Sequence, residues 1–105
     1  MNNLPLSQLL GTLYDWKGER LFTVIETPEF TVNTLGNLDH TETDGNQIFV
    51  KVDNDTTVSI FIEDITNLAI NSDSIIIQSH NKIISIEKCI TATCFDHGVI
   101  FQNLI

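Results

Sequence analysis

The sequence predicts a small all-β domain with one short N-terminal helix. Apolar and polar residues alternate over 47–52 and again over 57–62, which places one set of side chains on a core face and the other set outward. The apolar runs consist mostly of Ile, Val and Phe, with frequent Thr, and these side chains suit a pleated, half-buried surface. A length of 105 residues and a hydrophobic share of 42% fit a single globular domain.

The stretch 46–70 contains the clearest strand signals. Its alternation predicts a hairpin whose core face carries Ile48, Val50, Val52, Val58, Ile60 and Ile62. Phe49 and Phe61 then point away from this core, where we expect them to pair across the hairpin. The tract Asp-Asn-Asp-Thr at 53–56 is typical of a turn, because these side chains bond their own backbone and tolerate left-handed geometry. A single helical turn at 63–65 then leads into another strand.

The N-terminal third predicts a helix and two strands. Leucines at helical spacing and Trp16 indicate a helix over 4–16, which Gly18 is placed to end, and we expect its apolar face to pack on the core. Strands are expected at 20–27 and 29–38, with Gly36 marking a bulge or a bend. We interpret the polar tract 39–46 as a long hairpin tip that ends in the turn dipeptide Asp44-Gly45.

The C-terminal third predicts further hairpins. Strands around 75–78 and 83–86 flank a turn at His80-Asn81. The run Ile75-Ile76-Ile77 indicates either burial on both faces or an exposed edge. The remaining segment, 89–105, has two apolar runs separated by residues 96–98 and is expected to form another hairpin.

The order of elements from 4 to 70 resembles that of the Sm-like and SH3-like small β-barrels. The phrase VSIFIEDITNLAI (58–70) is similar to the end of such barrels, where the fourth strand passes through a helical corner into the fifth. The resemblance implies a small barrel, extended here by C-terminal hairpins. In the bacterial Sm-like proteins it would further imply ring oligomers that bind RNA. A β-sandwich is the alternative architecture.

The charge balance disfavours binding to nucleic acid. The formal net charge is −9, from 14 acidic and 5 basic side chains. The lysines and the arginine are scattered, whereas binding to DNA or RNA requires clustered cations that replace condensed counterions. An anionic membrane surface is disfavoured for the same reason. The charge favours a basic partner, whose complementary potential speeds encounter, although solubility alone also explains it.

No motif in the sequence predicts an enzyme, a metal site or a cofactor. The N-terminus lacks the pattern of a signal peptide and no run is long enough to span a membrane, so we expect a cytoplasmic protein with free thiols at Cys89 and Cys94. These cysteines, near Asp96 and His97, do not have the ligand spacing typical of zinc sites. The acidic runs lack the spaced pattern of a calcium loop. The neighbours of His40 favour a raised pKa, although we interpret it as a solvated loop histidine.

The sequence therefore predicts a non-enzymatic, acidic protein-interaction module. Its expected surface is a hydrophobic patch around Phe49 and Phe61, rimmed by Asp39, Glu42 and Asp44, that selects a basic protein. One specific version is an inhibitor of the anti-defence or immunity type, which would occupy the basic channel of a nucleic-acid-binding protein. The alternatives are a small-molecule or nucleotide binder and a self-assembling barrel, so a homo-oligomer is also considered.

Overall fold

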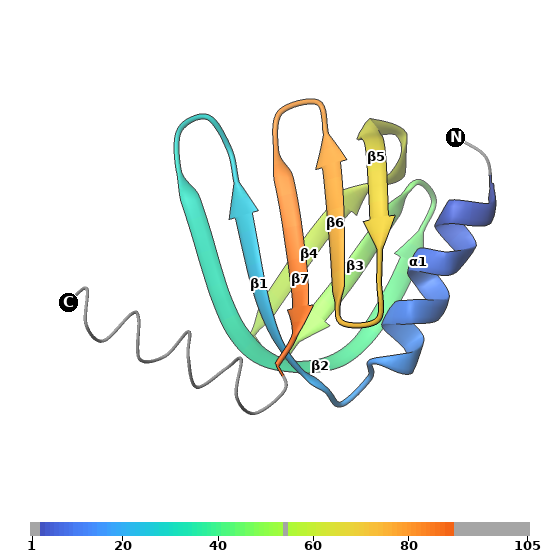
Figure 1. Ribbon diagram of the computed structural model, residues 1–105, viewed down its shortest axis with the longest axis vertical. Coiled ribbons are helices and arrows are strands. Elements are labelled where there is room, and N and C mark those ends of the chain that lie inside the picture. Colours follow the sequence, from blue (N-terminus) through green and yellow to red (C-terminus); the bar gives the residue numbers. More distant parts are fainter. Residues whose placement is uncertain (1–2, 54, 90–105) are drawn as a thin grey trace.

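The computed structural model describes residues 3–53 and 55–89 and consists of one helix and a sheet of seven strands (Figure 1). The helix α1 spans Asn3–Asp15. The strands are β1 (Arg20–Glu26), β2 (Thr31–Asp44), β3 (Gln47–Val52), β4 (Thr56–Phe61), β5 (Ile65–Ile70), β6 (Ser74–Ser79) and β7 (Ile83–Lys88). A single 3₁₀ turn, η1 (Ile62–Asp64), connects β4 to β5. The predicted class, mostly β with one N-terminal helix, is confirmed.

The sheet is antiparallel throughout and open. Its strands lie in the order β4-β3-β2-β1-β7-β6-β5, so β4 and β5 form its two edges although they are consecutive in the chain. The hairpin β6–β7 lies between β5 and β1, and β7 pairs with β1 from Leu21↔Lys88 to Glu26↔Ile83. Within the described residues the sheet does not close into a barrel, because β4 and β5 do not pair with each other.

The long strand β2 folds the sheet over on itself. In Figure 1 it curves along the bottom of the molecule, so that β3 and β4 lie behind β1, β7, β6 and β5. The register of β2 against β3 shifts between Leu38 and His40, which makes Asp39 the extra residue of a bulge. Before the bulge Gly36 and Leu38 face inward, whereas after it Thr41 and Thr43 lie opposite the buried Val50 and Ile48.

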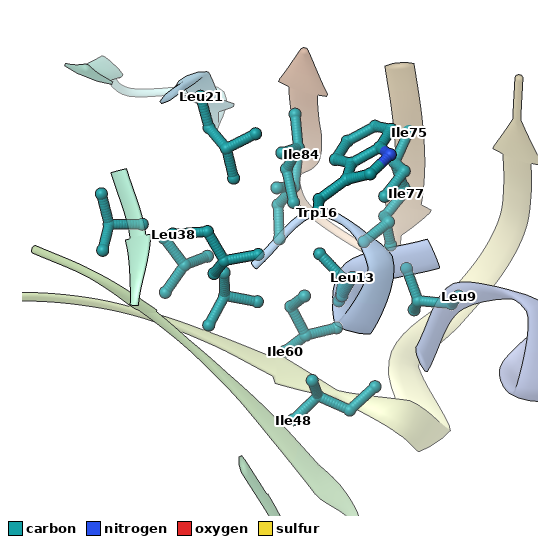
Figure 2. Close-up of a cluster of buried hydrophobic side chains, with 14 of the residues drawn as sticks. Leu9, Leu13, Trp16, Leu21, Leu38, Ile48, Ile60, Ile75, Ile77 and Ile84 are labelled. Carbon is teal, nitrogen blue, oxygen red and sulfur yellow. The ribbon is translucent and has the colours of Figure 1, made fainter. Parts of the chain in front are cut away.

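The core lies between these two layers, and α1 packs against it (Figures 1 and 2). Leu9, Leu13 and Trp16 reach from the helix and its final turn towards isoleucines of both layers. The buried cluster comprises Leu9, Leu13, Trp16, Leu21, Leu38, Ile48, Val50, Val52, Val58, Ile60, Ile65, Ile75, Ile77, Ile84 and Ile86. The prediction that the apolar face of the helix covers the core is therefore confirmed.

Local sequence signals explain where the chain turns. Gly18 has a φ of +87°, a left-handed conformation that glycine adopts without steric cost, and it follows the helix as predicted. Gly45 has a φ of +61° in the two-residue turn between Asp44 and Gln47. Asp53 also has a positive φ, of 54°, in the predicted turn after β3. The expected helical turn before β5 is present as η1.

The structure corrects two expectations about the strands. The polar tract 39–46 is not a long loop, because β2 continues through Asp44 and only a tight turn follows. The isoleucine run in β6 lies neither at an edge nor buried on both faces: Ile75 and Ile77 are fully buried, while Ile76 is exposed on the opposite face. The hairpin expected in 89–105 lies outside the described residues, apart from its first position.

Candidate interaction surface

The sequence-predicted site residues gather on one face of the sheet, here called the β2–β4 outer face. Directly opposed residues of antiparallel strands share a face, and on β3 and β4 the residues opposed here alternate with buried core residues. Three rows cross the strands from β2 through β3 to β4: His40–Lys51–Thr57, Glu42–Phe49–Ser59 and Asp44–Gln47–Phe61. Four of the five predicted site residues stand in these rows, and Asp39 occupies the bulge beside His40.

Phe49 and Phe61 both point away from the core, as predicted, but they are not directly opposed. Phe49 lies opposite Ser59, and Phe61 lies opposite Gln47. The two rings are therefore diagonal neighbours, a spacing that aromatic side chains can bridge. Phe61 remains 43% exposed, whereas Phe49 is half-buried and the Lys51 Nζ atom lies 5.8 Å from the centre of its ring.

The acidic residues at this face form a network around His40. The Nδ1 atom of His40 lies 2.7 Å from Oδ2 of Asp39, and its Nε2 atom lies 3.0 Å from Oε1 of Glu42. Across the strand pair, Lys51 Nζ lies 4.0 Å from Oε2 of Glu42. The bulge produces this arrangement, because it lets two carboxylates of one strand reach both ring nitrogens of the histidine. Two cations and two carboxylates thus balance one another when His40 is protonated.

The hydrogen bond with Asp39, followed by that with Glu42, raises the pKa of His40 above its ordinary 6.5. The direction expected from the sequence is confirmed, although His40 lies in a strand rather than a loop. A raised folded-state pKa means that protonated His40 stabilises the fold at pH values below the unfolded-state pKa. This contribution is lost as the pH rises through the folded-state pKa.

We expect Asp39→Asn to lower the pKa of His40, because the variant removes the nearer carboxylate and its negative charge. An NMR titration of the His40 ring protons measures the effect. Asp44→Asn is the matched control, since it removes a carboxylate from the same strand that makes no hydrogen bond with His40. Equal titration of His40 in the wild type and in the Asp39→Asn variant would contradict the proposed cause of the shift.

The cysteine expectation requires a correction. Cys89 follows β7 and is disulfide-bonded, so it does not carry the free thiol that we expected. The other cysteine of the chain, Cys94, lies outside the described residues, as do Asp96 and His97. Among the described residues, no group of three His, Cys, Asp or Glu side chains is placed to hold a metal ion. No described helix has the length and apolar character needed to cross a membrane.

Comparison with known proteins does not assign a family. No protein-family model matches the chain, and neither the curated proteins nor the solved structures contain a significant match. Function is therefore inferred from the geometry of the described residues.

His40 and Lys51 belong to the β2–β4 outer face, but the surface expected from the sequence does not include them. For His40 the reason is that a long loop is expected over 39–46, and loop residues have no assigned face. Lys51 belongs to the outward set of the strand predicted over 47–52, as Phe49 does. The signal that places His40 is its alternation, together with Glu42 and Asp44, with Thr41 and Thr43. Threonine favours strands, and this period of two predicts that the three charged or titratable residues share a face.

Proposed function

We propose that this protein is a non-enzymatic interaction module that binds a basic protein through the β2–β4 outer face. The observation that carries the proposal is the exposed ring of Phe61, which stands in one row with Asp44 and diagonal to Phe49. Exposed aromatic side chains next to charged groups are typical of binding surfaces, in which an apolar centre is surrounded by a polar rim.

The charge of the chain supports a basic partner. A net charge of −9 favours encounter with a positively charged surface. On the β2–β4 outer face, Asp39 and Glu42 both contact the ring of His40 and Glu42 also pairs with Lys51, while Asp44 makes no ion pair within the described residues. Asp44, which Gln47 of β3 separates from Phe61 in the same row, is therefore the carboxylate of this face that is most available to a cation of the partner. In the specific version of this proposal, the partner is a nucleic-acid-binding protein whose basic channel is blocked.

Self-assembly is the second candidate, and it is favoured by the two edges of the sheet. Strands β4 and β5 each pair on one side, and they are joined through η1 in the order that resembles Sm-like and SH3-like barrels. An unpaired edge presents backbone groups that can pair with another chain. Pairing of β4 in one copy with β5 in another would provide hydrogen-bond partners for the backbone groups of both edges.

Reversing three charges on the proposed surface should abolish capture of the partner. The test compares tagged wild type, a site variant (Asp39→Lys, Glu42→Lys and Asp44→Lys) and a control variant with the same charge change elsewhere (Glu19→Lys, Glu29→Lys and Asp73→Lys). In a pull-down from host lysate read by mass spectrometry, we expect a basic protein that rising salt releases. The site variant should retain about tenfold less of it than the control variant, because repulsion replaces attraction at the contact.

The outcomes of this pull-down separate the two candidates. Equal loss in both variants would show that net charge alone determines capture and would contradict the proposed surface. Capture of the protein itself alone would favour self-assembly. Circular dichroism of all three proteins checks that the charge reversals leave the fold intact.

A further inference from the structure

A cavity of about 310 Å³ lies between α1 and the second half of β2. Its lining comes from two elements: Leu10, Leu13, Tyr14 and Lys17 belong to the helix and the turn that follows it, and His40, Thr41 and Thr43 belong to β2. This volume lies at the lower end of the range of about 300–1,000 Å³ that is typical of small-molecule sites. The bulge contributes to the cavity, because it turns Thr41 and Thr43 towards the inner side of the strand.

The floor of this cavity is apolar and its mouth is polar. Leu13 is fully buried and Leu10 is half-buried, so their side chains form a fixed hydrophobic surface. Tyr14 and Lys17 are exposed and lie at the rim on the helix side. An apolar floor with a few polar groups at one end is the usual arrangement of a site for a small amphipathic molecule.

The charges at the mouth favour an anionic group on that molecule. On β2, Asp39 and Glu42 are held by the two ring nitrogens of His40, and Glu42 also lies within 4.0 Å of Lys51 on β3. When His40 is protonated, these two carboxylates are thus balanced by His40 and Lys51 of the chain itself. Lys17, in contrast, makes no ion pair within the described residues. Its ammonium group is the unbalanced charge among the lining residues.

We propose that this cavity binds a small organic carboxylate, with its apolar body against Leu10 and Leu13 and its carboxylate facing Lys17. The proposal goes beyond the binding of a basic protein, because the ligand enters from the helix side of β2 and not from the β2–β4 outer face. The two sites share His40, which lines the cavity and also stands in the first row of the β2–β4 outer face. The helix α1 and its following turn supply four of the lining residues.

An NMR titration with phenylacetate tests this proposal, and phenylacetamide is the uncharged control of nearly the same shape. We expect phenylacetate to shift the backbone amide signals of residues 10–17 and 40–43 and to bind about two- to fivefold more tightly than phenylacetamide. This ratio of affinities corresponds to about 0.5–1 kcal/mol, which is within the usual contribution of a solvent-exposed ion pair.

Two lysine variants assign the preference to the cavity. Lys17→Gln should bind both probes equally, because the attraction of the ammonium group is removed while the apolar floor remains. Lys82→Gln, at the distant turn between β6 and β7, should retain the preference for phenylacetate. Lack of binding, equal affinity of both probes for the wild type, or a preference that survives Lys17→Gln would overturn the proposal. None of these results affects the charge-reversal test of the β2–β4 outer face.

Discussion

Replacing Leu13 with alanine should lower the free energy of unfolding by about 2–5 kcal/mol, the usual cost of removing a buried leucine side chain. Leu13 is fully buried where α1 meets the two layers of the sheet, close to Ile60 and Ile77 (Figure 2). A small domain has a total stability of about 5–15 kcal/mol, so this single change removes a large share of it. Urea unfolding measures the loss, and the fluorescence of the single, buried Trp16 reports it.

The next residue in the chain provides the matched control. Tyr14 is 78% exposed, so Tyr14→Ala removes a larger side chain from the same helix without opening a cavity in the core. We expect it to change the free energy of unfolding by less than about 1 kcal/mol. If the two variants unfolded at the same urea concentration, the packing of α1 on the core would be contradicted.

The strands most accurately predicted from the sequence are those whose two faces differ most in polarity. In β3 and β4, buried Val and Ile alternate with more exposed residues, so the period of two is visible in the sequence itself. The second half of β2 has no such contrast. Its inward residues Thr41 and Thr43 are polar, as its outward residues are, and the alternation changes phase at the bulge. A pattern based on hydrophobicity therefore does not identify this part of the strand.

The arrangement of the strands depends on contacts that are distant in the sequence. The local sequence pattern of β6 and β7 does not predict that this hairpin pairs with β1 and lies between β1 and β5. The isoleucine run illustrates the same limit, because the exposure of Ile76 follows from an outer face that no local signal identifies. Local propensity predicts which segments are strands, while pairing between distant segments determines which strands are neighbours.

The candidate surface is only partly predictable from the sequence, because local patterns identify the face of a residue but not its neighbours on other strands. The sequence places Phe49 and Phe61 correctly on one face, because their own strands show clear alternation. Their diagonal relation depends on the register of β3 against β4, which the alternation of apolar and polar residues does not specify. The pairing of His40 with Asp39 and Glu42 depends on the position of the bulge.

Replacing Gly36 with alanine should destabilise the protein by about 1–3 kcal/mol, the range for forcing extra atoms into a packed site. A Cβ atom at this position would contact the carboxylate of Asp53 and lie 2.8 Å from Cγ1 of Val52. Neither group can move easily. Val52 is buried in the core, and Oδ1 of Asp53 accepts a hydrogen bond of 3.0 Å from the backbone N–H of Asn37.

Gly11→Ala should have the opposite effect, which makes it the control for Gly36→Ala. Gly11 is an exposed residue in the middle of α1, and a methyl group there would meet nothing within 4 Å beyond its chain neighbours and the backbone of its own helix. Alanine should therefore stabilise the helix by about 1 kcal/mol. Urea unfolding of both variants shows directly whether each substitution lowers or raises the free energy of unfolding. If Gly36→Ala did not shift the midpoint to lower urea, the close approach of β2 to the turn after β3 would be refuted.

A double variant then identifies which contact causes the loss at Gly36. Asp53→Gly removes the carboxylate that the new methyl group would meet, and glycine adopts the positive φ of this position without strain. The two substitutions should therefore be non-additive: in the Gly36→Ala background, Asp53→Gly should cost less than it does alone, or even restore stability. If the two changes in the free energy of unfolding were simply additive, the loss in Gly36→Ala would instead come from the contact with Val52, on the core side of the bend in β2.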